Sequence, residues 1–242
     1  MAFNSSTLAT RYNTFYIMTA PANVYQPATP DPAAATRDAL AVAQAGFLPI
    51  VEVFYSLQGE GMRTGQATIF VRFAGCNLAC DFCDTDFRVA ETHTVQSLLD
   101  RVVVEGGECR WVCLTGGEPT IHELGAFCDA LHIAGFRIQL ETNGTRPQPS
   151  WKIDHTTVSP KQPQGGKLHS WYLINANEFK IVVDGPDDLA RAAHCAEAST
   201  TRVYLQPNAL NADAVSACID AVKQHPNDFQ LSLQTHKFLS IR

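Results

Sequence analysis

Three cysteines crowd into one short segment of this 242-residue chain, Cys76, Cys80 and Cys83, with the spacing C-x3-C-x2-C. A structural zinc site takes four protein ligands, and no fourth Cys or His lies nearby with paired spacing; the nearest downstream is His93. Three thiolates suit a four-iron cluster in which one iron has no protein ligand. The triad therefore favours a [4Fe–4S] cluster over a zinc knuckle.

Polar and glycine-rich segments follow several predicted strands. The first, Thr115-Gly116-Gly117-Glu118-Pro119, contains two glycines that let the backbone approach a ligand closely. Each such segment alone is typical of a turn or a helix cap. Their recurrence at successive strand ends predicts a ligand site, with hydroxyl, amide and charged groups supplied by Glu118, Asn143, Ser159, Lys161 and Gln206.

The elements that position these residues alternate along the chain. Apolar runs predict strands at 48–55, 67–73, 111–114, 136–140, 155–158, 179–183, 203–205 and 229–233, and periodic apolar stripes predict helices at 95–103, at about 121–134, from Pro186 and after Asn211. This order implies βαβ units and a parallel sheet. About six units predict an α/β fold, an open, partial (β/α)6-type TIM-like barrel with its chemistry at the carboxyl ends of strands.

The first 46 residues differ in composition from the rest. Pro21, Pro27, Pro30 and Pro32 and a run of alanines show no clear period, so residues 1–46 are predicted to form a flexible N-terminal extension, with a short helix at 36–45 as the alternative. Residues 47–242 are predicted to form the core domain.

Composition excludes several classes of function. The net charge of −6 argues against nucleic-acid binding, which needs a surplus of Lys and Arg. No apolar run is long enough to span a membrane, and the start lacks the features of a secretory signal. With most cysteines scattered, we expect a reduced, cytoplasmic protein.

The cysteine triad, with Phe82 between its last two members, resembles the radical S-adenosylmethionine (SAM) superfamily, and Thr115–Pro119 resembles that superfamily's GGEP motif. The resemblance implies that SAM binds the open iron and that one electron cleaves it to a 5′-deoxyadenosyl radical. The residues expected to hold SAM are Phe82, Cys83, Asp84, Gly117, Glu118, Asn143, Ser159, Pro160, Lys161 and Gln206.

Two residues beside the triad indicate a substrate. Alternation along 68–73 places Phe70, Arg72 and Ala74 on one face of the strand. An arginine at this strand end suits a substrate carboxylate, which its guanidinium can hold through two hydrogen bonds. Thr85 offers a hard oxygen that could complete a Mg²⁺ shell.

The chain resembles the 7-carboxy-7-deazaguanine synthase family over most of its length from Ile50: SLQGEG at 56–61, VRFAGCNLACDFCDT at 71–85, TGGEP at 115–119, ETNGT at 141–145, SPK at 159–161 and LSLQTHK at 231–237. The resemblance implies conversion of 6-carboxy-5,6,7,8-tetrahydropterin to 7-carboxy-7-deazaguanine with loss of ammonia, a step towards queuosine. It also implies Mg²⁺ at Thr85, a flavodoxin or ferredoxin as electron donor, and a homodimer. The expected substrate-binding residues are Leu57, Gln58, Gly59, Glu60, Arg72, Thr115 and Arg242.

Two alternatives stay open at this stage. A glycyl-radical-enzyme activase also uses C-x3-C-x2-C, but it would not need the SLQGEG segment or Arg72. The other alternative is a small iron–sulfur electron carrier or a zinc-stabilised binding module. The presence of only three cysteine ligands and the glycine-rich strand end argue against it.

Overall fold

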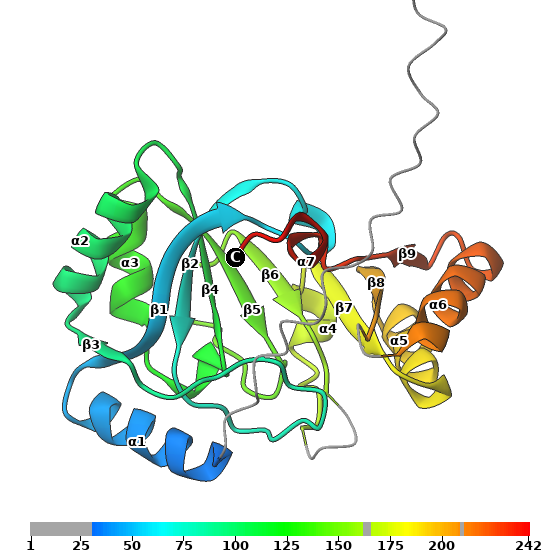
Figure 1. Ribbon diagram of the computed structural model, residues 1–242, viewed down its shortest axis with the longest axis horizontal. Helices are drawn as coiled ribbons and strands as arrows, with labels where there is room; N and C mark the ends of the chain where they lie inside the picture. The colour runs from blue at the N-terminus through cyan, green and yellow to red at the C-terminus, as the bar shows by residue number, and fades with distance from the viewer. Residues whose placement is uncertain (1–30, 162–165, 209–210) are drawn as a thin grey trace, which may run out of the picture.

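The computed structural model describes residues 31–161, 166–208 and 211–242 and is built around one nine-stranded sheet (Figure 1). The strands are β1 Leu48–Leu57, β2 Ala67–Phe73, β3 Glu91–His93, β4 Trp111–Gly116, β5 Arg137–Thr142, β6 His155–Val158, β7 Glu178–Val183, β8 Arg202–Pro207 and β9 Phe229–Leu231. The helices are α1 Pro32–Gln44, α2 Val95–Gly106, α3 Gly125–Ile133, α4 Tyr172–Asn175, α5 Pro186–Ala198, α6 Ala212–Gln224 and α7 Thr235–Leu239, with 3₁₀ turns η1 Gly61–Arg63 and η2 Pro119–Ile121.

Strand order confirms the predicted open α/β barrel. The order is β3-β1-β2-β4-β5-β6-β7-β8-β9, and every neighbouring pair from β2 to β9 is parallel. Helices α2 and α3 pack beside one half of the sheet, and α5 and α6 pack beside the other half (Figure 1). Because β3 and β9 lie at the two ends of the order, the sheet does not close.

The first strand departs from the predicted parallel pattern. Strand β1 pairs antiparallel with β2 and with β3. The connection 58–66 contains only the short turn η1, whereas a parallel pair needs a crossover of about a dozen residues or more. As a result, the SLQGEG segment after β1 lies at the opposite edge of the sheet from the cysteines after β2.

The two faces of the sheet differ sharply in chemistry. On one face, residues such as Val71, Leu114 and Ile181 are fully buried under the helices and form the two apolar cores. On the other face, strand register aligns Arg72 with Thr115 across β2 and β4. Farther along the same face, polar positions continue in register from strand to strand, Gln139 with His155 and Thr157 with Glu178. We call this polar side the inner face.

Several boundaries differ from the sequence prediction. The segment 121–134 divides into η2 and the shorter α3, and β9 ends at Leu231. The sequence did not predict β3, α4 or α7, which are all short. Among the described residues, 143–154 contain no helix, so β5 and β6 are joined without one. None of the helices described here is long and apolar enough to cross a membrane.

The N-terminal segment also differs from the predicted flexible extension. Residues 32–44 form helix α1, with Pro32 in its first turn. Asp31 caps the start of the helix, and its carboxylate accepts a hydrogen bond from Ala34 N at 2.9 Å. Helix α1 packs against β1, with Ala35 and Ala39 buried. A packed helix therefore occupies the part of the predicted extension that is described; residues 1–30 lie outside the described residues.

Candidate active site

The cysteine loop, residues 74–90, follows β2 at the carboxyl edge of the parallel strands. Its three thiols are half-buried and form no disulfide. Burial raises the pKa of Cys76 to about 12 and also raises the pKa of Cys80 and of Cys83. Repulsion from neighbouring sulfurs adds to the rise at Cys76 and Cys80, and the charge of Asp84 adds to the rise at Cys83. Because a cysteine binds metal as the thiolate, a bound cation would favour the ionised form of these thiols.

The donor set agrees with a four-iron cluster in its chemistry. Three thiols lie on one loop, and residues 74–90 contain no other Cys and no His. Within the described ranges, no three Cys, His, Asp or Glu side chains converge into a metal-binding group. The three side chains thus do not converge into the ligand geometry of a cluster. By their number and chemistry, Cys76, Cys80 and Cys83 are the residues that would hold it.

Two strand ends fasten the cysteine loop. Asn143, after β5, donates from Nδ2 to the side-chain oxygen of Asn77 at 2.9 Å, and Asn77 donates to Thr145 Oγ1 at 2.8 Å. After β6, Lys161 lies 5.5 Å from the ring centre of Phe82. Asn143 and Phe82, two predicted SAM-binding residues, are thus brought to the same edge as the cysteines.

Ser159 and Asp84 complete that edge. The ammonium group of Lys161 donates to Ser159 Oγ at 2.6 Å, and Pro160 follows Ser159 as a buried residue. Asp84, on the cysteine loop, is paired with Lys237 of α7 at 2.7 Å. Sequence reasoning therefore placed these three predicted residues, Ser159, Pro160 and Asp84, at the correct edge of the sheet, but it missed the tie to α7.

The two glycines at the end of β4 pack against the protein backbone, whereas the sequence predicted that they approach a ligand. Gly116 has φ +135°, and a Cβ on it would lie 2.2 Å from Phe73 O. A Cβ on Gly117 would lie 2.0 Å from Gly75 O and 3.0 Å from Cys76 Cβ. The two glycines therefore let the β4 end approach the backbone of the cysteine loop, where the sequence suggested approach to a ligand.

Gly117→Ala is accordingly expected to push the cysteine loop away and to lower the iron and sulfide content of anaerobically reconstituted protein by more than half. Gly185→Ala is the matched control, because a Cβ at Gly185 meets nothing within 4 Å and its φ is −162°. Metal analysis and thermal unfolding of both variants test the prediction. Wild-type iron content in Gly117→Ala would show that the close approach is not needed.

Glu118 occupies a different position from the predicted one. Its carboxylate is 1% exposed and accepts hydrogen bonds from Thr120 N, Thr120 Oγ1, Thr142 Oγ1 and Asn143 N at 2.6–3.1 Å. Burial raises the pKa of Glu118, and these donors oppose the rise. Because these four donors occupy its carboxylate, Glu118 joins the ends of β4 and β5. This arrangement does not favour the predicted direct contact between Glu118 and SAM.

At the centre of the inner face lies a buried charge cluster that the sequence did not reveal. Lys180 on β7 is paired with Glu60 and, at 3.1 Å, with Glu141 on β5. Gln58 donates to Glu141 at 3.0 Å, and Gln234 donates to Glu60 at 2.9 Å. These contacts confine Gln58 and Glu60, two predicted substrate residues, to the middle of the barrel.

Glu60 and Lys180 hold each other ionised. Burial raises the pKa of Glu60, but the charge and hydrogen bond of Lys180 outweigh it and bring the pKa to about 2. Burial lowers the pKa of Lys180, but Glu141 and Glu60 outweigh it and raise the pKa above its ordinary value. The signal that could have found Lys180 is a lysine between Phe179 and Ile181, in the apolar part of β7, a strand of the buried parallel sheet.

The C-terminal helix covers the SLQGEG segment. Thr235 donates to Gly59 O from both its backbone N, at 3.0 Å, and its hydroxyl, at 2.9 Å, and α7 lies beside η1 (Figure 1). A Cβ on Gly59 would lie 2.2 Å from the ring of His236. The absence of a side chain at Gly59 therefore leaves room for α7 to pack there. His236 of α7 lies against the SLQGEG segment and is half-buried.

Arg72 reaches the inner face but has a protein partner there. Its Nε donates to Glu52, its cross-strand partner on β1, at 2.9 Å. Among the residues that the structure describes, its two terminal nitrogens have no acceptor. Arg242 donates to the other oxygen of Glu52 at 2.5 Å and is 71% exposed, so it lies at the rim of the same strand.

The other predicted site residues are placed as follows. Thr115 faces the inner side beside Arg72, and Thr85 is half-buried, with its backbone oxygen 3.7 Å from Cys83 Sγ. Leu57 ends β1 and is 39% exposed. Gln206 is buried and accepts from Ser232 at 3.0 Å, which ties β8 to the segment after β9.

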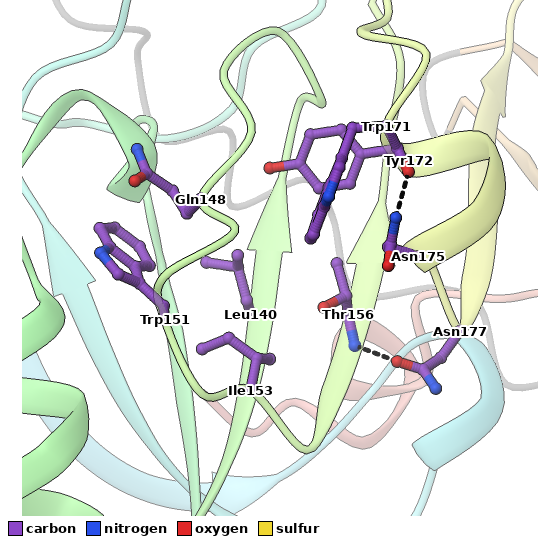
Figure 2. A pocket seen from close by; sticks show the side chains of 9 residues that line it. All are labelled: Leu140, Gln148, Trp151, Ile153, Thr156, Trp171, Tyr172, Asn175 and Asn177. Carbon is purple, nitrogen blue, oxygen red and sulfur yellow. Dashed lines mark hydrogen bonds between the residues drawn. The ribbon is translucent and has the colours of Figure 1, made fainter.

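A cavity of about 210 Å³ lies apart from these residues, where β5 and β6 lack a connecting helix (Figure 2). Trp151, Trp171 and Tyr172 line it together with amide side chains. Leu140 and Thr156, which point into it, alternate with the inner-face residues Glu141 and Thr157. The cavity therefore opens on the opposite face from the candidate site.

Comparison with known proteins agrees with this arrangement. A family model described as the radical SAM superfamily matches residues 70–154. The 7-carboxy-7-deazaguanine synthase of Bacteroides thetaiotaomicron is 42% identical over 197 residues, which cover 80% of this chain and 98% of the relative. The 7-carboxy-7-deazaguanine synthase of Neisseria meningitidis is 37% identical over 201 residues, which cover 79% of this chain and 93% of the relative. The crystal structure of QueE from Escherichia coli has a TM-score of 0.67 and 30% identity, covering 81% and 97% of the two chains.

The fold and the cysteine loop define a radical SAM enzyme, which carries a [4Fe–4S] cluster and SAM. Within that superfamily, the chain belongs to the 7-carboxy-7-deazaguanine synthase family. The family prediction is confirmed, and the relatives give no support to the activase.

Proposed function

We propose that this chain converts 6-carboxy-5,6,7,8-tetrahydropterin to 7-carboxy-7-deazaguanine with loss of ammonia. The terminal nitrogens of Arg72, which have no acceptor among the described residues, give this proposal its strongest support, because they lie on the inner face and can hold a carboxylate through two hydrogen bonds. The synthase name of the relatives supports the same substrate.

In this reaction the chain's residues bind and orient the two small molecules. Arg72 and Thr115 would hold the pterin carboxylate from adjacent strands, and Gln58 and Glu60 would bond the polar edge of the ring. The cluster and SAM, held by the cysteine loop and the strand ends beside it, would supply the radical chemistry that removes a hydrogen atom from the pterin. The SAM side would be formed by Phe82, Cys83, Asp84, Gly117, Asn143, Ser159, Pro160 and Lys161.

Four further assignments belong to the proposal. Thr85 would bind Mg²⁺ together with substrate oxygens and water, since its hydroxyl is a hard oxygen ligand beside Cys83. Family resemblance supports a homodimer, and it also supports a flavodoxin or ferredoxin as electron donor. The cysteine composition supports a cytoplasmic location.

An anaerobic assay with reductant, SAM, Mg²⁺ and the carboxylated tetrahydropterin tests the function. Formation of the deazaguanine product with repeated turnover of SAM is the expected result. Cleavage of SAM without consumption of the pterin would contradict the proposal and would favour an activase. Omission of Mg²⁺ should lower the rate if Thr85 holds the ion.

Arg72→Lys is expected to raise KM for the pterin about tenfold or more, because a lysine cannot form the paired hydrogen bonds. The cluster and SAM binding should be retained. Arg101→Lys is the matched control, since Arg101 lies on α2, away from the inner face, where it pairs with Glu105. Steady-state kinetics of both variants give the comparison, and an unchanged KM in Arg72→Lys would refute the carboxylate assignment.

A further inference from the structure

Thr36 of helix α1 is hydrogen-bonded to the backbone of Cys76, forty residues away in the chain. The backbone N–H of Cys76 donates to Thr36 Oγ1 at 3.1 Å. The Thr36 hydroxyl in turn faces two carbonyl oxygens, Cys76 O at 2.8 Å and Pro32 O at 2.7 Å. The Thr36 hydroxyl therefore accepts a hydrogen bond from the N–H of the first predicted cluster ligand and lies within hydrogen-bonding distance of its carbonyl oxygen.

Helix packing places Thr36 at this point. Ala39, one helical turn further along α1, is fully buried, and a Cβ added to Gly75 would lie 2.9 Å from Ala39 Cβ and 3.6 Å from Thr36 Cα. Gly75 has φ +81°, which disfavours any other residue there. Helix α1 lies at the same edge of the sheet as the cysteine loop (Figure 1). The helix thus closes directly over the turn that leads from β2 into Cys76.

The backbone around Cys76 is held from the other side as well. Gly75 donates to Phe87 O at 2.8 Å and accepts from Glu118 N at 2.9 Å. Leu78 N lies 3.4 Å from Cys76 Sγ, so the turn aims a backbone N–H at the sulfur. Hydrogen bonds to cluster sulfurs tune the stability and potential of iron–sulfur centres. Thr36 fixes the peptide groups on both sides of Cys76 and so fixes this turn.

None of the sequence motifs that mark the family includes α1. They begin at Ser56, and the relatives match 79–80% of this chain. The contact between Thr36 and Cys76 is therefore a feature that the family motifs do not predict.

We propose that Thr36 is a positioning residue for the iron–sulfur cluster: its hydroxyl holds the backbone of Cys76 and thereby slows loss of iron from the site. This rests on the cluster that the cysteine triad would hold, and it does not depend on which substrate the enzyme uses. It assigns a role in the active site to a helix outside the motifs of the family.

The test compares Thr36→Val with wild type in the full chain, reconstituted without oxygen. Valine keeps the branched shape but leaves the Cys76 N–H and C=O without their partner. Release of iron to a chelator in excess, followed by absorbance, should be about tenfold faster in Thr36→Val. The EPR spectrum of the reduced cluster should also shift, because the N–H aimed at Cys76 Sγ is no longer held in place.

Three variants serve as controls. Thr36→Ser keeps the hydroxyl and should restore the slow release of iron and the wild-type EPR spectrum. Thr36→Ala, which favours the helix more strongly than valine does, repeats the test if Thr36→Val does not fold. Thr201→Val removes a comparable hydroxyl bond, to Ala176 O at 3.2 Å, away from the cluster and should behave as wild type.

Iron release from Thr36→Val and Thr36→Ala at the wild-type rate would overturn the positioning role while leaving the proposed function intact. Fast release from Thr36→Ser would also overturn it, because the hydroxyl would then be irrelevant. Absence of iron from the wild-type protein itself would remove the cluster on which both proposals rest.

Discussion

Cys83→Ala should lose its iron and form no detectable product. Two thiolates cannot replace three around a four-iron cluster, and Cys83 lies between Phe82 and Asp84, both of which contact residues from other strand ends or from α7. The folded chain should persist, because the Cys83 thiol is half-buried and takes no part in the two apolar cores.

Cys109→Ala is the matched control for this prediction. Cys109 is also half-buried and reduced, but its sulfur lies near Ala67 O and Trp111 O, at the other ends of β2 and β4. Iron content, visible absorbance and product formation should match wild type in Cys109→Ala. Retained iron and turnover in Cys83→Ala would show that this thiol is not a ligand.

Lys180→Met is expected to lower the free energy of unfolding by about 3–5 kcal/mol and to abolish pterin turnover. Removing one partner of a buried ion pair leaves an uncompensated charge, and losses of this size are typical. Here two carboxylates, Glu60 and Glu141, would lose the ammonium group that pairs with both of them. Denaturant unfolding under anaerobic conditions measures the loss of stability.

Two further variants sharpen that experiment. Lys223→Met, on the exposed end of α6, should change the free energy of unfolding by less than about 0.5 kcal/mol. Adding Glu60→Gln to Lys180→Met should recover part of the lost stability, because one of the unpaired charges is removed. A loss below about 1 kcal/mol in Lys180→Met would mean that the cluster is open to water and contributes little.

The candidate site is built from two opposite edges of one sheet. The cysteine loop and the strand ends that fasten it lie at the carboxyl edge. The SLQGEG segment enters from the other edge, since β1 is antiparallel, and Glu60 reaches Lys180 at the centre. SAM and the pterin would then meet on the inner face, with Arg72 at the pterin carboxylate.

Local sequence was sufficient for the elements that local forces decide. Apolar runs located the long strands, and the positions of Cys76, Cys80 and Cys83 directly after β2 followed from chain order alone. Alternation along β2 placed Arg72 opposite the buried Val71 and Phe73, as the structure has it. The family was evident because its motifs occupy fixed places relative to these strands.

Long-range pairing decided what the sequence could not show. The partners of Arg72 and Glu118 are Glu52 on β1 and a set of donors from η2 and the end of β5, and no local pattern specifies them. Helix α1 gave a weak local signal, since its stability comes from packing of Ala39 against Gly75. The charges of Lys180 and Glu141 became partners only when register aligned the inner face.

Mössbauer spectroscopy of anaerobically reconstituted, ⁵⁷Fe-labelled protein, recorded before and after addition of SAM, tests the central claim most directly. We predict a [4Fe–4S] signal in which one iron site changes on addition of SAM, because only Cys76, Cys80 and Cys83 hold the cluster. A spectrum that SAM leaves unchanged, or a metal that the protein ligates completely, would contradict the account.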